Sequence, residues 1–197
     1  PAEFSAISGI AAHAGQLIVS EMTSHTLRCV NSDGSTTLYS GKPTPETDGV
    51  GPLAKFQGPD GISIDNNGHL FVADSLNYSI RKISGDGTTV TVAGSSPGYV
   101  DANGLEAKFS NPVGLIEDGA GNILVGDDNA LRKIAPNGDV TTLAGGTTGS
   151  DDGMGAAAKF NGLTDLVLDS HGDIFATDKY NNSIRKITPS GDVTTFA

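Results

Sequence analysis

Residues 70–83, with the sequence LFVADSLNYSIRKI, contain two strand-like runs that are separated by a polar turn. The tripeptide that ends this segment recurs along the chain. Its copies are Arg81-Lys82-Ile83, Arg132-Lys133-Ile134, Arg185-Lys186-Ile187 and a weaker Arg28-Cys29-Val30. Successive copies lie 53, 51 and 53 residues apart, which is a spacing typical of tandem structural repeats.

A second landmark lies between the copies of the first and has the same period. It consists of Ala54-Lys55-Phe56, Ala107-Lys108-Phe109 and Ala158-Lys159-Phe160, with Ala2-Glu3-Phe4 as the first copy. These copies are spaced by 52, 53 and 51 residues. Because two independent landmarks keep one order and one period, the sequence indicates four copies of a single unit.

Each unit contains four short strand-like segments. In the second copy they are residues 61–64, 70–73, 79–83 and 88–93, and the last is rich in β-branched residues. Asp65-Asn66-Asn67-Gly68 joins the first two segments with the composition of a hairpin turn. No stretch of ten residues has the apolar spacing of a helix, which excludes crossover helices and a parallel sheet.

Tandem units of four antiparallel strands predict an all-β fold, a β-propeller with four blades. We expect one domain over residues 1–197, with blades at about 4–41, 56–94, 109–145 and 160–197. Gly9, Gly61 and Gly114 precede an apolar residue of the first strand and would let the innermost strands approach one another. Asp165 occupies this position in the fourth copy.

Three stretches resemble the NHL-repeat family of β-propellers. They are FSNPVGLIEDGAGNILV at 109–125, VADSLNYSIRKI at 72–83 and GDVTTFA at 191–197. The resemblance extends over nearly the whole chain and implies a propeller fold. It implies little about function, because propellers of this family include binding modules, sensor domains and a few lyases or hydrolases.

The resemblance implies six blades most often, whereas four units fill this sequence. Three arrangements therefore stay open. The chain could close alone as a four-bladed ring, two chains could pair as a homodimer into an eight-bladed ring, or the chain could be part of a longer propeller. An open half-ring would expose two apolar blade faces to water, so we expect no stable open monomer.

Charge and cysteine content exclude several classes of function. The chain has 12 Lys and Arg against 23 Asp and Glu, a formal net charge of −11, so it lacks the basic face that nucleic acids or anionic membranes require. The single Cys29 excludes an intrachain disulfide framework. No apolar run has the length of a membrane span. Secreted, periplasmic and cytoplasmic locations all stay open.

Acidic residues recur in two sets that are candidates for a binding surface. One set follows the second strand, the other precedes the landmark Phe by eight residues, and we expect both to surround the mouth of the central channel. There they could concentrate cations, basic peptides or Ca²⁺. Repetition in every blade favours structural turns instead, because Asp bonds nearby backbone amides. The residues are Glu21, Asp74, Asp127 and Asp178 in the first set and Asp48, Asp101 and Asp152 in the second.

Two further residues break the repeat symmetry and are candidates for a site in the channel. They are His13, where the other copies have Asp, and Asp165. The histidines form no metal-binding motif, and no serine-nucleophile motif is present, so we identify no catalytic residue. The Arg of each tripeptide is expected to pair with a carboxylate of a neighbouring blade.

The favoured hypothesis is a non-enzymatic binding or scaffold module. Its linkers between blades, residues 41–55, 94–108 and 145–159, are longer than a simple connection needs and would present a surface to a protein, peptide or glycan. One alternative is a Ca²⁺-dependent lactonase-like hydrolase or lyase with carboxylates at the channel mouth. A second alternative is a structural subunit that assembles through its exposed blade faces.

Overall fold

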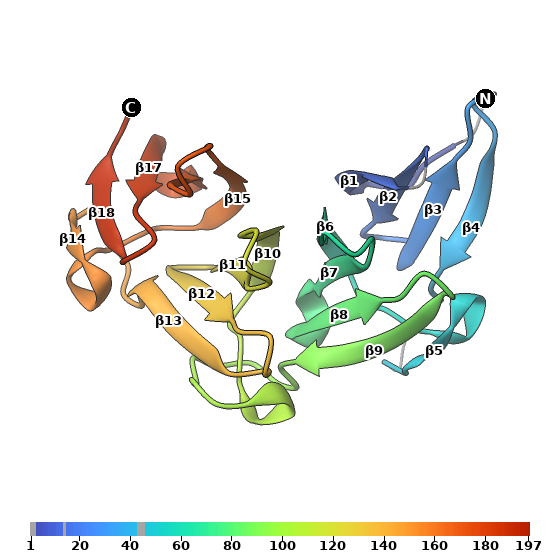
Figure 1. The fold of residues 1–197 in the computed structure, drawn as a ribbon, viewed down its shortest axis with the longest axis horizontal. Helices are drawn as coiled ribbons and strands as arrows, with labels where there is room; N and C mark the ends of the chain where they lie inside the picture. The colour runs from blue at the N-terminus through green and yellow to red at the C-terminus, as the bar shows by residue number, and fades with distance from the viewer. Residues whose placement is uncertain (1–2, 14, 43–45) are drawn as a thin grey trace.

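The computed structural model describes residues 3–13, 15–42 and 46–197 and shows an all-β, four-bladed propeller (Figure 1). Ala2 of the first landmark and residues 43–45 of the first linker lie outside these residues. Each blade is an antiparallel meander in which the strands follow the order of the chain. The prediction of four blades of four antiparallel strands is therefore confirmed.

Blades 1 and 2 occupy the N-terminal half of the chain. The strands of blade 1 are β1 (Ile7–His13), β2 (Gln16–Glu21), β3 (Thr26–Val30) and β4 (Thr36–Ser40). Those of blade 2 are β6 (Pro59–Ile64), β7 (Leu70–Asp74), β8 (Ser79–Ile83) and β9 (Thr88–Ala93), and the short β5 (Gly49–Val50) adds to its outer edge.

Blades 3 and 4 repeat this arrangement. Blade 3 comprises β10 (Pro112–Glu117), β11 (Ile123–Asp127), β12 (Ala130–Ile134) and β13 (Val140–Gly145). Blade 4 comprises β15 (Leu163–Leu168), β16 (Ile174–Asp178), β17 (Ser183–Ile187) and β18 (Asp192–Thr195), with β14 (Gly153–Met154) at its outer edge.

In the described residues, the helical segments are single 3-10 turns of three residues each. Three lie in the linkers, namely η1 (Gly51–Leu53), η3 (Gly104–Glu106) and η4 (Gly155–Ala157). The other two, η2 (Ser75–Asn77) and η5 (Lys179–Asn181), follow the second strand of blades 2 and 4. No helix in the described part of the chain is long and apolar enough to span a membrane.

The hydrophobic core lies between consecutive blades. Ile18 and Leu27 of blade 1 pack with Phe56, Leu70 and Val72 on the facing side of blade 2. Equivalent clusters join blade 2 to blade 3 and blade 3 to blade 4. Each blade is therefore stabilised mainly by its neighbours, since one sheet cannot remove both of its apolar faces from water.

The inner strands approach so closely that only glycine fits at one position of β1, β6 and β10. A Cβ on Gly61 would lie 2.4 Å from the carbonyl oxygen of Val113 in the next blade. On Gly9 and Gly114 it would lie 2.5 Å from the corresponding carbonyl of the following blade. The predicted role of these glycines in close approach is therefore visible as a direct steric constraint.

The blades follow one another along an arc, and blades 1 and 4 form its two ends (Figure 1). Strands β1, β6, β10 and β15 line the inner edge of this arc, and the outermost strands and linkers form its circumference. The two end blades each keep one broad face without a neighbouring blade in the described chain. These faces carry several of the exposed large apolar side chains.

We expect Gly114→Ala to lower the free energy of unfolding by about 1–3 kcal/mol, because the new methyl group overpacks the contact between blades 3 and 4. Gly85→Ala is the matched control, since a Cβ there meets no atom within 4 Å. It should change stability by less than about 1 kcal/mol. Urea denaturation measures both, and equal stability of the two variants would contradict the steric explanation.

Candidate functional site

A buried arginine in each of blades 2, 3 and 4 connects the incoming linker to the sheet. In blade 2, Arg81 donates from Nη1 to Asp74 (3.1 Å) and from Nη2 to Asp48 (2.9 Å). It also donates to the backbone carbonyls of Lys55 (2.9 Å) and Thr47 (3.2 Å). One guanidinium group therefore holds a strand carboxylate, a linker carboxylate and the linker backbone together.

The same geometry recurs in the next two blades. Arg132 binds Asp127 at 3.1 Å and Asp101 at 2.7 Å, and it donates to the carbonyl of Lys108 at 3.0 Å. In blade 4 the distances from Arg185 are 2.9 Å to Asp178, 2.7 Å to Asp152 and 2.8 Å to the carbonyl of Lys159. We call these groups the arginine clusters.

Each arginine cluster also includes the landmark phenylalanine. The guanidinium carbon lies 5.0 Å from the ring centre of Phe56 in blade 2, 5.2 Å from Phe109 in blade 3 and 5.1 Å from Phe160 in blade 4. All three arginine side chains are fully buried, so this cation–π contact is shielded from water. The Nε atoms of Arg81, Arg132 and Arg185 are buried without a hydrogen-bond partner.

The strand carboxylates of these clusters are interior groups that accept several hydrogen bonds. Asp127, for example, accepts from the backbone amides of Ser110 (2.8 Å) and Asn111 (2.7 Å) as well as from Arg132. Asp74 and Asp178 are also fully buried and accept from the residue after the landmark Phe. These carboxylates fix the point at which each linker enters the innermost strand.

Burial governs the acidity of two of these carboxyls. Desolvation raises the pKa of Asp74 to about 6, although hydrogen bonds from Asn77 and Gln57 and the charge of Arg81 act in the opposite direction. The pKa of Asp127 is raised to about 6 in the same way. For the linker residue Asp101, burial is outweighed by hydrogen bonds from Thr142 and by Arg132, and its pKa is lowered.

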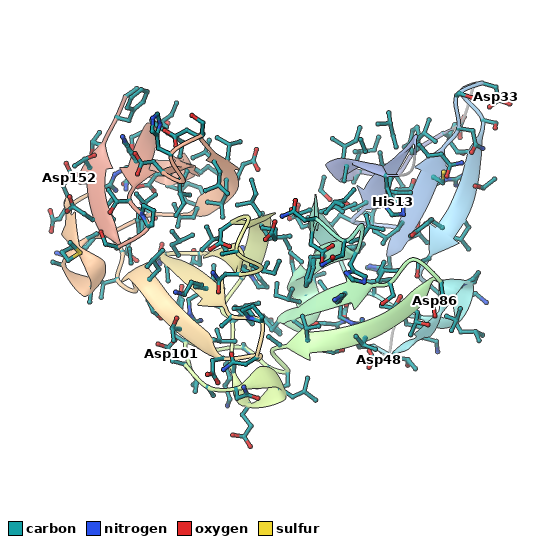
Figure 2. The ribbon with its side chains drawn as sticks, viewed as in Figure 1. His13, Asp33, Asp48, Asp86, Asp101 and Asp152 are labelled. Atoms are coloured by element: carbon teal, nitrogen blue, oxygen red, sulfur yellow. The ribbon has the colours of Figure 1, made fainter. Side chains whose placement is uncertain are left out.

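The linker carboxylates do not surround the channel mouth, so that expectation is wrong. Figure 2 places Asp48, Asp101 and Asp152 on the outer circumference, where each linker runs along the outer edge of the blade it enters. Their side chains are about half exposed, at 51%, 48% and 48%, with one oxygen on the cluster arginine. The arginine partners are thus in the same blade and its linker, and the predicted pairing with a neighbouring blade is also wrong.

In blade 1 the corresponding group is looser. Glu21 takes the place of the strand Asp and lies 4.0 Å from Nε of Arg28. It accepts instead from the amide of Ser5 and the hydroxyl of Thr26, both at 2.8 Å. The Arg28 side chain keeps 29% exposure, in contrast to the fully buried arginines of the other blades.

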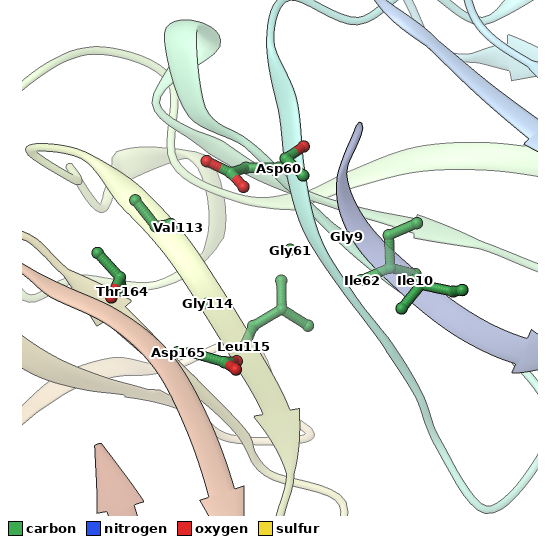
Figure 3. A pocket seen from close by; sticks show the side chains of 11 residues that line it. Gly9, Ile10, Asp60, Gly61, Ile62, Val113, Gly114, Leu115, Thr164 and Asp165 are labelled. Carbon is green, nitrogen blue, oxygen red and sulfur yellow. The ribbon is translucent and has the colours of Figure 1, made fainter. Parts of the chain in front are cut away.

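A separate pocket of about 380 Å³ lies along the inner edge of the arc (Figure 3). It is lined by the inner strands of all four blades and includes the candidate residue Asp165 and a second carboxylate, Asp60. These two carboxylates come from β6 and β15, the strands on either side of β10. Burial raises the pKa of Asp60, and a hydrogen bond from Ser8 opposes this effect.

The other symmetry-breaking candidate, His13, does not line this pocket. It ends β1 and lies edge-on to Tyr39, with ring centres 6.5 Å apart. His13 and Asp165 are therefore at different places in the structure. Across residues 3–13, 15–42 and 46–197, no group of three or more His, Cys, Asp or Glu side chains is placed to hold a metal ion.

The sequence analysis missed two residues, Asp60 in the lining of the pocket and Thr177 in contact with that lining. Asp60 stands where the other copies have Ser8, Val113 and Thr164, so aligning the repeats at this position would have identified it. The hydroxyl of Thr177 contacts that of Thr164 at 2.8 Å and accepts from the amide of Asp165 at 2.9 Å. Thr177 replaces Ser20, Ala73 and Gly126 of the other copies.

Replacing a cluster arginine should be severe, because it leaves buried carboxylates without their cation. We expect Arg132→Met to lower the free energy of unfolding by about 3–5 kcal/mol. Lys133→Met removes the same charge at a partly exposed neighbouring position and should change it by no more than about 0.5 kcal/mol. Chemical denaturation of both variants tests the clusters, and a mild effect of Arg132→Met would argue against them.

The raised pKa values predict a pH dependence of stability. Between about pH 4 and pH 6 the folded chain keeps protons on Asp74 and Asp127 that the unfolded chain has released. These two groups therefore make the free energy of unfolding fall as pH rises through this window, by up to about 3 kcal/mol each. The double variant Asp74→Asn/Asp127→Asn should flatten that slope in urea titrations at pH 4 to 7, and an unchanged slope would refute the assignment.

Comparison with known proteins identifies the repeat. A family model for the NHL repeat matches residues 56–83, which extend from the landmark Phe through β8. The human NHL repeat-containing protein 2 is 32% identical over 131 residues, which are 60% of this chain and 18% of that protein. The Arabidopsis thaliana protein SUPPRESSOR OF QUENCHING 1 is 35% identical over 88 residues, 43% of this chain and 8% of its own length.

Solved structures share the fold at lower identity. Virginiamycin B lyase from Staphylococcus aureus matches with a TM-score of 0.68 and 22% identity over 96% of this chain and 55% of its own. An auxiliary nutrient binding protein from Bacteroides ovatus matches with a TM-score of 0.75 and 20% identity, over 97% of this chain and 48% of its own. The chain thus spans about half of these structures and less than a fifth of the two relatives. Residues 56–83 thus match an NHL repeat, and with its four repeated blades the chain is similar to NHL-repeat β-propellers.

Proposed function

We propose that the chain is a non-enzymatic binding module that presents its inter-blade linkers to a protein or peptide partner. The observation that supports this proposal is a set of exposed apolar side chains on linkers whose bases are firmly anchored. Leu53 is 70% exposed, Leu105 57% and Met154 56%. Exposed apolar side chains that recur on one part of a surface are typical of interaction sites.

Each linker is anchored at several points, so binding would require little ordering. The 3-10 turn donates from Gly51, Gly104 or Gly155 to the turn between the third and fourth strands of its blade, at 3.0, 2.9 and 2.8 Å. The arginine cluster holds the linker on one side of this turn, and the buried Ala and Phe of the landmark hold it on the other. A preformed surface loses less conformational entropy on binding.

The charge of the chain favours a basic partner. With a net charge of −11, the surface should speed the encounter with a segment rich in Lys or Arg and slow the encounter with an acidic one. The exposed side chains at the tips of the linkers are mainly aliphatic, so they can bury apolar side chains of a partner. We therefore favour a basic peptide or protein segment with apolar anchors over a glycan.

A library of random peptides tests this proposal, because selection from it does not require the partner to be identified. Twelve-residue peptides displayed on phage would be selected on the chain, and the affinities of the selected peptides measured by calorimetry. We expect apolar residues flanked by Lys or Arg, and at least about tenfold weaker binding to Leu53→Ser/Leu105→Ser/Met154→Ser. Leu76→Ser, at a 51% exposed position outside the linkers, is the control. Equal losses in both variants would count against the linker surface.

An enzymatic function is the second candidate, and the inner-edge pocket is the observation that favours it. The pocket collects Asp60 and Asp165, and burial raises the pKa of Asp60, which favours its protonated form and suits a role in proton transfer. The Ca²⁺-dependent hydrolase or lyase alternative stays a prediction. Titration calorimetry with CaCl₂ on the chain and on Asp60→Asn/Asp165→Asn tests it, because a carboxylate site would lose its binding heat in the variant.

A further inference from the structure

A second pocket, of about 490 Å³, lies between blades 2 and 3, and we call it the blade 2–3 groove. Both blades have a neighbouring blade on each side, so the groove lies inside the array of blades and not on an end face. Buried Phe71 of blade 2 and buried Ile123 and Ile134 of blade 3 line it with apolar surface. It shares no residue with the inner-edge pocket, so the two are separate places on the molecule.

One repeat position explains why space is left here. On the fourth strand of blades 1, 2 and 3, the residue two positions before the glycine that ends the blade packs against the core shared with the following blade. This residue is Tyr39 in blade 1, Val92 in blade 2 and Leu143 in blade 3. Because valine is the smallest of the three, the contact between blades 2 and 3 leaves space where a larger side chain stands in the other two contacts.

Contacts with the turn between the third and fourth strands of the following blade show the same difference. A Cβ on Gly191 in blade 4 would lie 2.6 Å from the carbonyl oxygen of Leu143, so that turn packs directly on the preceding blade. The equivalent glycine in blade 3 is Gly138, and the three atoms nearest to a Cβ there, at 3.3 to 3.8 Å, all belong to the linker residue Asn103. The blade 3 turn therefore stands back from Val92, and both line the groove.

The groove also holds a cation that pairs with no carboxylate among the described residues. This cation is Lys82, whose Nζ lies 5.5 Å from the ring centre of Phe71. In blade 4 the equivalent Lys186 pairs with Asp173 at 2.7 Å. His69 stands in place of Asp173 in blade 2. The ammonium group of Lys82 is therefore available to a negatively charged ligand beside an apolar surface.

The other charged group in the described lining, Asp65, is held by its own turn. It accepts from the backbone amides of Asn67 at 2.9 Å and His69 at 2.8 Å. Its second oxygen contacts Nδ1 of the His69 ring at 2.8 Å. Because these bonds already occupy the carboxylate, the charge in the groove that is free to bind a ligand is positive.

We propose that the blade 2–3 groove binds a ligand in which an aromatic ring is joined to a carboxylate. The ring would lie against Phe71 and Val92, in the space that corresponds to Tyr39 in the preceding contact, and the carboxylate would pair with Lys82. Burial of the ring supplies the affinity, and the ion pair supplies the preference for an acid. The volume is in the range of small-molecule sites. The proposal does not rest on the linker surface, whose exposed tips lie outside the lining.

Titration calorimetry with 3-phenylpropionate tests the site, with 3-phenylpropanamide and 3-phenylpropylamine as the neutral and cationic analogues. We expect the acid to bind at least about tenfold more tightly than either analogue. The peptide Gly-Gly-Phe carries the same ring and carboxylate at its C-terminus and distinguishes two sources of this chemistry. Equal binding of this peptide would assign the groove to peptide C-termini, and weaker binding would assign it to free aromatic acids. Equal binding of acid, amide and amine, or no binding of the acid at millimolar concentration, would overturn the proposal.

Val92→Tyr tests the location, because it introduces the side chain that blade 1 carries at this position. We expect the variant to fold, as judged by circular dichroism, and to bind 3-phenylpropionate at least about 100-fold more weakly. Leu76→Tyr adds the same ring at a 51% exposed position outside the groove and should bind normally.

Lys82→Met tests the ion pair at a partly exposed position where folding is not at risk. It should remove the preference for the acid and leave the binding of 3-phenylpropanamide unchanged. Normal binding by Val92→Tyr, or a retained preference for the acid in Lys82→Met, would refute the assignment of the site.

Discussion

The burial of one guanidinium group in each of blades 2, 3 and 4 is the interaction on which the shape of these blades and the position of their linkers depend. Arg132 reaches the second strand through Asp127 and the linker through Asp101 and the Lys108 carbonyl. A linker of about 15 residues would otherwise be free to adopt many paths across the blade. Because the cation is fully buried, its carboxylate partners cannot be removed singly without a large electrostatic penalty.

This anchoring separates two roles that acidic residues have in the chain. The strand carboxylates are internal counterions, whereas the linker carboxylates are half exposed and share their oxygens between the arginine and the outermost strand. Asp101, for example, also accepts from the amide and hydroxyl of Thr142. The linkers are thereby fixed at their bases while their tips stay in water. A rigid scaffold with exposed apolar tips supports a binding role better than a catalytic one.

Much of the fold could be predicted from the repeats, but the paths of the linkers could not. The landmark spacing predicted the blades, and the short strands around Arg81, Arg132 and Arg185 lie where expected. The arginines were expected to contact a neighbouring blade, because the sequence does not show that each linker first joins the outer edge of the blade it enters. Short strands such as β5 and β14, with two residues each, carry no recognisable pattern.

Residues that differ from their counterparts in the other repeats indicated candidate functional sites better than residues that recur in the repeats. Asp165 replaces a glycine that the other three copies share, whereas Asp60 and Thr177 stand at positions where all four copies differ. These residues lie at the inner edge or on the open face of blade 4. A residue that recurs along the repeats is explained by a contact that recurs with it, as the arginine clusters of blades 2, 3 and 4 show. Asp165 is instructive here, because the glycine it replaces is required wherever a blade follows at the usual spacing. A Cβ at that position meets a carbonyl of the following blade at 2.4 to 2.5 Å in the other three copies, so Asp165 departs from the packing that these glycines permit.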